Sequence, residues 1–359
     1  MSWLLLFVPI SIALELLAPE RHLLIFAASA LAIVPLAGCM GRATEQLAVR
    51  LGEGVGGLLN ATFGNAAELI IAFAALRAGL YTVVKASLVG SIVGNILLVL
   101  GAAMLAGGLR HEEQHYNVAG ARSQATLLTL AAIALILPGA YRLAIGAGAP
   151  GSLSVWIALV LLAVYAANLV YSLITHAKLF AGERAPEAPE HGAEGHEHEE
   201  VWSPARAAGV LAAATAAIAW MSEILVGAIE PSSEALGLND AFVGVFVVAI
   251  LGNAAEHATA VTAALRNRMD LSLSIAIGSS VQVALFVAPL LVLVSLFVGP
   301  QPMDLAFSGG MVVTVLLAVL ITGQVAGDGR SDWLKGVQLL AVYVILGLTY
   351  FFAPMPPPG

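Results

Sequence analysis

The chain has 359 residues, of which 60% are hydrophobic and only 11% are charged. Soluble domains carry about 25% charged residues, so this composition excludes an ordinary soluble protein. The net charge of −8 is largely local, because seven glutamates lie in the tract Ala181–Glu200. Nothing in the charge balance points to a nucleic-acid partner.

Apolar runs long enough to cross a bilayer as helices make up most of the chain. A membrane helix needs about 20 mostly apolar residues, and a run such as Ile92–Leu105 lacks the alternation of a barrel strand. We therefore predict an all-α polytopic membrane protein with about eleven transmembrane helices, embedded in lipid. The predicted spans are residues 3–17, 23–39, 54–77, 81–108, 121–138, 153–175, 205–228, 241–265, 271–298, 304–323 and 333–352.

The first predicted span lacks the basic leader and cleavage site of a signal peptide, so it is expected to remain as a helix. The third span continues an amphipathic segment that begins near Ala43, and together they give about 35 residues, too many for one straight crossing. Glycines are expected to bend this segment and expose backbone carbonyls, to allow close helix packing, as in Gly52-x-x-x-Gly56 and Gly90-x-x-x-Gly94, or to do both. The bending candidates are Gly52, Gly54, Gly56, Gly57 and Gly64.

Residues 176–204 form the only substantial polar insert between predicted spans, and they contain His191, His196 and His198 among glutamates. Such a tract binds metal weakly, senses pH, or serves as a solvated linker. No P-loop pattern occurs, so nothing indicates an ATP-driven pump.

Orientation follows from the excess of Lys and Arg in cytoplasmic loops. Eleven of these residues fall on the side of the insert and four on the other side. The count predicts a cytoplasmic N-terminus and insert, and an external C-terminus, in the inner (plasma) membrane of a prokaryote. The eleven are Arg42, Arg50, Arg110, Arg122, Lys178, Arg184, Arg206, Arg266, Arg268, Arg330 and Lys335; the four are Arg21, Arg77, Lys85 and Arg142.

A pentapeptide recurs 188 residues along the chain, as Gly64-Asn-Ala-Ala-Glu68 and Gly252-Asn-Ala-Ala-Glu256. A Gly-Ser pair repeats at the same offset, at Gly90-Ser91 and Gly278-Ser279. Two matches at one offset indicate duplication. Because five spans is an odd number, two five-helix repeats would enter the membrane from opposite sides, as in secondary transporters. The predicted organisation is an extra N-terminal helix over residues 1–21, repeats over 22–175 and 205–359, and the loop 176–204 between them.

The duplicated carboxylates are the strongest candidates for an ion site. A charge deep in a bilayer costs at least about 2.5–3.5 kcal/mol, so Glu68 and Glu256 are expected to be functional. Asn65 and Asn253 lie three residues earlier, on the same helical face. Two carboxylates and two amide oxygens match the oxygen ligands that Ca²⁺ prefers, and no thiolate or imidazole cluster favours zinc or copper. Further oxygens are expected from Ser91, Asn95, Ser279 and Gln282, although buried serines also bond their own backbone.

Three other polar residues are candidates for a secondary proton or ion pathway. Glu45 lies on the amphipathic segment, where a solvated face is the alternative, and Glu223 lies within the seventh span. His257 follows Glu256 but projects about 100° away around the helix, so it is expected to orient neighbours or titrate and is not assigned as a ligand.

These motifs resemble the Ca²⁺/H⁺ antiporters of the cation/Ca²⁺ exchanger superfamily. The likeness covers both halves, in Asn60–Ala72, Lys85–Ser91, Gly252–Ala258 and Gly278–Gln282. It implies eleven helices and Ca²⁺ coordination by Asn65, Glu68, Asn253 and Glu256. Sodium/calcium exchangers of the superfamily typically carry a proline before the motif glutamate; Ala67 and Ala255 stand here instead, which favours protons as the counter-ion.

The predicted function is therefore exchange of Ca²⁺ for H⁺ by alternating access, with no cofactor and no enzymatic activity. The paired glutamates would bind either Ca²⁺ or protons, and the empty charged site would be too costly to cross. Two alternatives remain: the same scaffold acting on Mn²⁺ or coupled to Na⁺, and an intramembrane hydrolase using Glu256, His257 and Ser279. The hydrolase lacks a His-Glu-x-x-His or Gly-x-Ser-x-Gly pattern. The sequence leaves oligomeric state open, with a homo-oligomer as one alternative.

Overall fold

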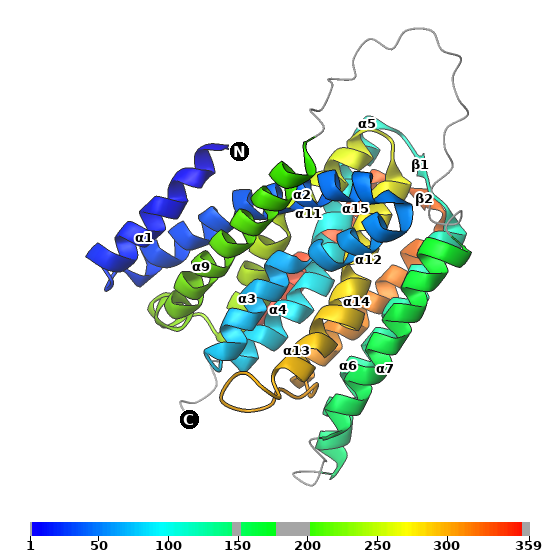
Figure 1. Cartoon of the computed structure of the whole chain (residues 1–359). Helices are drawn as coiled ribbons and strands as arrows, with labels where there is room; N and C mark the ends of the chain where they lie inside the picture. Colours follow the sequence, from blue (N-terminus) through cyan, green and yellow to red (C-terminus); the bar gives the residue numbers. More distant parts are fainter. Residues whose placement is uncertain (1, 146–151, 177–201, 354–359) are drawn as a thin grey trace.

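The computed structural model describes residues 2–145, 152–176 and 202–353. Nearly all of the regular structure in these ranges is helical (Figure 1), and nine helical stretches are long and apolar enough to cross a membrane. They are His22–Leu51, Tyr81–Arg110, Val118–Arg142, Ser152–Thr175, Pro204–Leu236, Asp240–Leu265, Met269–Val294, Gly309–Asp328 and Trp333–Phe351. The predicted all-α membrane fold is confirmed. Two shorter apolar helices, Trp3–Leu17 and α3 (Ala66–Arg77), occupy the other predicted spans.

The first half begins with η1 (Ser2–Leu6) and α1 (Phe7–Leu17). The remaining elements of this half are α2 (His22–Phe63), α3, α4 (Tyr81–Val93), η2 (Gly94–Val99), α5 (Leu100–Arg110), β1 (Gln114–His115), α6 (Val118–Ile145), α7 (Ser152–Val170) and η4 (Tyr171–Thr175). The second half contains α9 (Pro204–Leu236), α10 (Asp240–Phe242), η5 (Val243–Val248), α11 (Ala249–Leu265), α12 (Met269–Gln282), η6 (Val283–Val287), α13 (Ala288–Val294), α14 (Gly309–Asp328), β2 (Arg330–Ser331) and α15 (Trp333–Phe351). The predicted loop 176–204 falls mostly outside the described residues.

The third predicted span, residues 54–77, is divided between two helices, and the division falls at Gly64, one of the predicted bending positions. Helix α2 extends to Phe63, and the helical hydrogen bonding is interrupted at Gly64–Asn65 before α3 begins. A predicted bend is confirmed at Gly56, where an added Cβ would lie 2.3 Å from the carbonyl oxygen of Ala48. A straight helix separates residues eight apart by about 12 Å, so α2 turns sharply between these two residues.

The centre of the molecule is formed by the spans that carry the Gly-Ser pairs. In the most apolar windows of Tyr81–Arg110 and Met269–Val294, 83% and 67% of the residues are buried, against 22% for Trp333–Phe351. Both central spans contain a π-helical segment, η2 and η6, at positions that correspond under the 188-residue offset. The repeated sequence thus folds into repeated structure. Helices α1, α2 and α9 lie together on one flank (Figure 1).

The two halves pack closely at Gly90, the first glycine of the predicted Gly90-x-x-x-Gly94 pattern. A Cβ at Gly90 would lie 2.2 Å from the carbonyl oxygen of Val245, so α4 and η5 approach each other through bare backbone. Gly94 differs, because nothing lies within 4 Å of its Cβ position. The packing interpretation is therefore confirmed for Gly90 alone.

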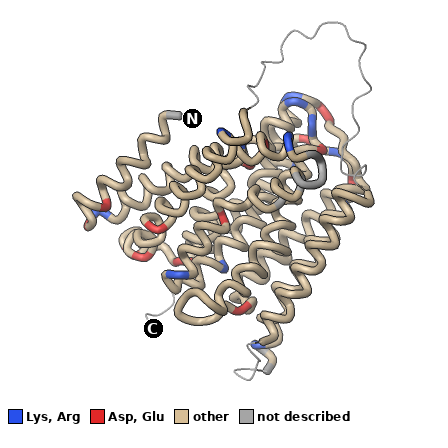
Figure 2. The backbone as a smooth tube through the Cα atoms, viewed as in Figure 1, with Lys and Arg blue, Asp and Glu red and all other residues tan. Residues whose placement is uncertain are grey.

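Charged residues gather at the two ends of the bundle (Figure 2). At one end β1 pairs antiparallel with β2, and Arg330 contacts Glu113 at 3.5 Å. At the other end Asp304 bonds both Lys85 and Arg142, the latter at 2.7 Å. The side of the membrane that each end faces stays a prediction.

Candidate ion-binding site

The interruption between α2 and α3 places the first motif. Asn65 occupies the N-cap position of α3 with φ −101° and ψ 18°, yet its side chain caps no amide of that helix. An N-cap asparagine usually accepts a bond from its own first turn. Here the side chain reaches the second repeat instead, and Glu68 stands in the first turn of α3. The local break thus frees two polar side chains to face the other half.

The second motif lies on an uninterrupted helix. Asn253 and Glu256 both belong to α11, and the Asn253 amide donates to the Ala249 carbonyl of its own helix at 3.0 Å. Glu256 is therefore in mid-helix, whereas Glu68 is at a helix start. Asn65 and Asn253 are 1% and 2% exposed, so both asparagines are buried.

The two motifs interlock through their glycines. A Cβ at Gly252 would lie 2.8 Å from Cγ of Glu68, and a Cβ at Gly64 would lie 3.6 Å from Oε1 of Glu256. Gly252 therefore makes room for Glu68, whereas the distance at Gly64 is an ordinary van der Waals contact with Glu256. This crossed arrangement brings the two carboxylates to one region between the halves.

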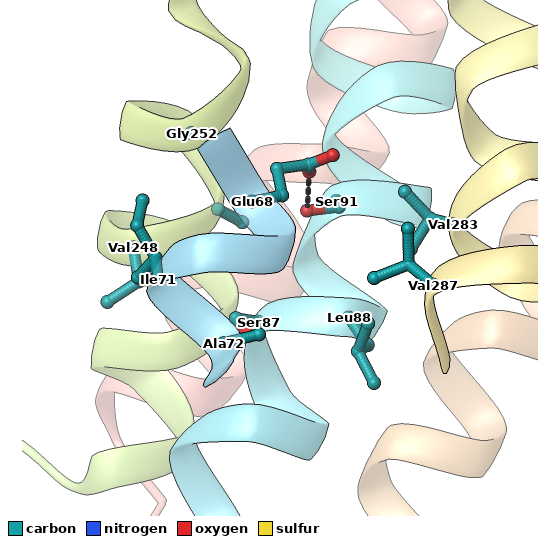
Figure 3. A pocket seen from close by; sticks show the side chains of 11 residues that line it. Glu68, Ile71, Ala72, Ser87, Leu88, Ser91, Val248, Gly252, Val283 and Val287 are labelled. Atoms are coloured by element: carbon teal, nitrogen blue, oxygen red, sulfur yellow. Dashed lines mark hydrogen bonds between the residues drawn. The ribbon is translucent and has the colours of Figure 1, made fainter. Parts of the chain in front are cut away.

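Hydrogen bonds cross between the repeats at Glu68. Its Oε1 accepts from the Ser91 hydroxyl, a contact drawn in Figure 3, and from the Asn253 amide. The Asn253 amide also donates to Ser91 Oγ at 3.2 Å. Glu68 is thus held by one donor from its own repeat and one from the other.

The corresponding contacts around Asn65 also join the two repeats, but here the serine donates to the asparagine, whereas Asn253 donates to Ser91. Ser279 donates its hydroxyl to Asn65 Oδ1 at 3.0 Å, and Asn65 Nδ2 donates to Gln282 Oε1 at 2.5 Å. Serine and asparagine therefore pair across the repeats in both halves of the site.

Asn95 and His257 adjoin this cluster from one side. Asn95 Nδ2 donates to Ser279 Oγ at 3.1 Å, and Asn95 Oδ1 lies 3.2 Å from His257 Nε2. Because an amide oxygen only accepts, Nε2 carries the proton of this contact. The predicted residues thus form two separate hydrogen-bonded groups, one of Glu68, Ser91 and Asn253 and one of Asn65, Gln282, Ser279, Asn95 and His257. Glu256 adjoins the second group, because the Cβ position of Gly64 lies 3.6 Å from its Oε1 and 3.8 Å from Gln282 Oε1.

The two glutamates line different pockets. Glu256, Gln282 and Ser279 line an open cavity of about 810 Å³ that also reaches Arg42 and Glu45. Glu68 and Ser91 line a small pocket of about 10 Å³ with mainly apolar walls, including Val248, Val283 and Val287. Figure 3 shows these valines projecting from helices of the second repeat toward the Glu68 pocket. One carboxylate faces open space and the other a narrow apolar pocket.

One oxygen of each carboxylate is buried without a partner: Oε2 of Glu68 and Oε2 of Glu256. A buried, unpaired carboxylate oxygen is costly unless a proton or cation satisfies it. Within the described ranges no three His, Cys, Asp or Glu side chains gather as a metal cluster, so amide and hydroxyl oxygens would supply the neutral ligands. The arrangement is chemically suited to a hard cation.

The two glutamates predicted for a secondary ion pathway lie in different places. Glu45 lines the open cavity, whereas Glu223 pairs with Arg77 at 3.1 Å and lines neither of these two pockets. Thr259 and Ser274 line the cavity and were not singled out from the sequence. Thr259 follows Glu256 by three residues, a spacing that places both on one helical face and would have identified it.

Known proteins of similar sequence identify the family of this chain. The sequence pattern of the family described as sodium/calcium exchanger protein matches residues 21–174 and again residues 206–352, close to the two predicted repeats. A Ca²⁺/H⁺ antiporter of a Synechocystis species is 47% identical, over 98% of this chain and 96% of its own length. The Ca²⁺/H⁺ antiporter ChaA of Bacillus subtilis is 42% identical, over 91% and 92% of the two chains.

Solved structures agree with the fold. The selenium-substituted Ca²⁺/H⁺ antiporter YfkE superimposes with a TM-score of 0.81 at 37% identity, covering 98% of this chain and all of that one. The H⁺/Ca²⁺ exchanger CAX, at 18% identity and a TM-score of 0.70, shares the fold. With its two matched repeats and these full-length relatives, the chain belongs to the sodium/calcium exchanger protein family.

Proposed function

We propose that the protein is a secondary transporter that exchanges Ca²⁺ for H⁺. The observation that carries this proposal is the crossed pair Glu68 and Glu256, one from each repeat, with one buried unpartnered oxygen on each. The names of the relatives, Ca²⁺/H⁺ antiporters from two bacteria, support the same choice of ions.

In the Ca²⁺-loaded state, both carboxylates bind the ion together with the oxygens of Asn65 and Asn253. Ca²⁺ takes about 6–8 oxygen ligands, so hydroxyls, Gln282 and water from the open cavity complete the shell. In the other loaded state, protons satisfy the same carboxylates. The competition means that apparent Ca²⁺ affinity falls as the pH is lowered.

Alternating access follows from the inverted repeats. Glu256 lines the open cavity, while Glu68 lies in the small apolar pocket, and we take the cavity as the open end of the site. Exchanging the conformations of the two repeats opens the opposite end. The empty, doubly charged site is too costly to complete this transition, which makes exchange obligatory.

We place the open cavity on the cytoplasmic side. The cavity reaches Arg42, on the side that carries eleven of the fifteen Lys and Arg residues. Such an excess favours the cytoplasm. The structure would then represent an inward-open state.

The proposal is tested with purified protein in liposomes under an imposed pH gradient. The expected result is ⁴⁵Ca²⁺ accumulation that depends on the gradient and disappears when a protonophore collapses it. Parallel assays with Mn²⁺ as substrate, and with a Na⁺ gradient at uniform pH, separate the alternatives. Ca²⁺ accumulation driven by Na⁺ but not by protons would contradict the proposal.

A further inference from the structure

The ion site departs from its internal symmetry at three neighbouring positions. Under the 188-residue offset, Gln282 corresponds to Gly94, Asn95 to Val283, and His257 to Leu69. In each of these pairs the polar member belongs to the network that ends at Asn65 and Gln282. The apolar member Val283 lines the pocket of Glu68. The two halves of the site are therefore built differently.

The polar members join a hydrogen-bond chain in which every step crosses between repeats. His257 Nε2 donates to Asn95 at 3.2 Å, Asn95 to Ser279 at 3.1 Å, and Ser279 to Asn65 at 3.0 Å. Asn65 then donates to Gln282 at 2.5 Å. The amide of Asn95 accepts through its oxygen from His257 and donates through its nitrogen to Ser279. The Nε2 proton of His257 therefore sets which way the Asn95 amide is turned, and this in turn sets the direction of the bonds that follow it.

The half of the site around Glu68 contains a shorter set of hydrogen bonds. There the Asn253 amide donates to Ser91 Oγ directly, at 3.2 Å, and the Ser91 hydroxyl donates to Glu68. Asn65 does not give its amide to Ser279 in the same way, because its oxygen faces the Ser279 hydroxyl and its nitrogen faces Gln282. Asn95 supplies the missing donor to Ser279. The Ser279 hydroxyl consequently points to Asn65, and Glu256 keeps its free oxygen beside the open cavity.

Asn95 lies where it can orient its neighbours. It is 1% exposed and belongs to the lining of neither of these two pockets. Both ends of its amide are already engaged, by His257 and by Ser279. It sits on the π-helical segment η2, a type of turn that is frequent at functional sites.

We propose that Asn95 and His257 form a positioning pair that orients Ser279 and Asn65, so that Glu256 and its amide neighbours form the half-site that receives Ca²⁺ first. The inference rests on the proposed function and adds that the two carboxylates have unequal roles. His257 acts as a hydrogen-bond donor through Asn95 and contacts neither the cation nor the transported proton.

The test measures apparent KM and kcat for Ca²⁺ in liposomes for variants that install the mirrored residue. These are Asn95→Val, His257→Leu and the double variant, with His257→Gln as the conservative change that retains a donor. Asn168→Val on α7 is the matched control, because it makes the same substitution outside the site. Thermal unfolding of each variant shows whether it is folded.

Loss of a buried hydrogen bond predicts an increase in KM of about fivefold to tenfold for Asn95→Val and for His257→Leu. The kcat should change less, and the double variant should be no worse than either single one, since both break the same chain. His257→Gln should keep the wild-type KM and pH profile. An unchanged KM in Asn95→Val, additive effects, or a His257→Gln variant as impaired as His257→Leu would each overturn the proposal.

Should Asn95→Val fail to fold, the comparison of His257→Gln with His257→Leu decides the matter alone. Absence of Ca²⁺ uptake by the wild-type protein would instead count against the proposed function.

Discussion

Ser280 donates its hydroxyl to the carbonyl oxygen of Ile92 at 3.3 Å, and these two residues occupy equivalent positions in the two repeats, 188 residues apart. Equivalent positions come into contact only where the symmetry axis passes between them. The axis therefore runs between α4 and α12, one residue from Ser91 and Ser279. Residues of the ion site lie around this axis, which explains why the contacts of the site occur in crossed pairs.

The glycine contacts near this axis give a prediction for stability. Gly90→Ala should lower the free energy of unfolding by about 1–3 kcal/mol, because the new methyl group would meet the backbone of Val245 and overpack the interface. Gly94→Ala is the matched control, with nothing within 4 Å of the added atom. Thermal unfolding in detergent compares the two. Equal melting temperatures would contradict the close approach of α4 and η5.

The ion pair between Arg77 and Glu223 gives a second prediction. Both side chains are about half exposed on the outside of the bundle, at 56% and 51%, and Glu223 lines neither pocket of the candidate site. The Glu223→Gln variant should therefore remain folded and retain exchange. The double variant Arg77→Glu/Glu223→Arg, which reverses the pair, should also fold and take up Ca²⁺. Initial rates of Ca²⁺ uptake check this. Abolished uptake by a folded Glu223→Gln variant would instead assign the residue to the proton pathway.

Topology is tested at the two ends of the bundle. Single cysteines replace Glu112, in the α5–α6 loop, or Gln301, in the α13–α14 loop, in a Cys39→Ala background. An impermeant thiol reagent applied to intact cells should label the Gln301→Cys variant only. Labelling of Glu112→Cys from outside, with Gln301→Cys protected, would reverse the proposed orientation.

Much of this architecture could be predicted from the sequence, because duplicated polar residues inside apolar spans have few structural explanations. Glu68, Glu256 and their asparagines were identified in this way, and the structure brings them together. The donor pairings could not be predicted, since they depend on how the repeats pack. It is the packing that sets Ser279 against Asn65 while Ser91 meets Asn253.

The sequence predicted a bend among five glycines that include Gly64, but it did not predict that only one of the two repeated motifs would be interrupted. The same pentapeptide, Gly-Asn-Ala-Ala-Glu, interrupts the helix at Gly64–Asn65 but lies within continuous α11 at Gly252. Identical local sequences have identical propensities, so tertiary context decides the outcome. The sharp bend of α2 near Gly56, which has no counterpart before α11, is the visible difference.

The most direct test of the account is proton-driven Ca²⁺ uptake by Glu68→Gln and Glu256→Gln in liposomes. Glutamine keeps the volume and one oxygen but supplies neither a negative charge nor an exchangeable proton. Each variant should be folded, with both Ca²⁺ binding and uptake abolished. Asn65→Ala and Asn253→Ala should be impaired less, because water can replace a neutral oxygen. Near-normal uptake by either glutamine variant would contradict exchange through paired carboxylates.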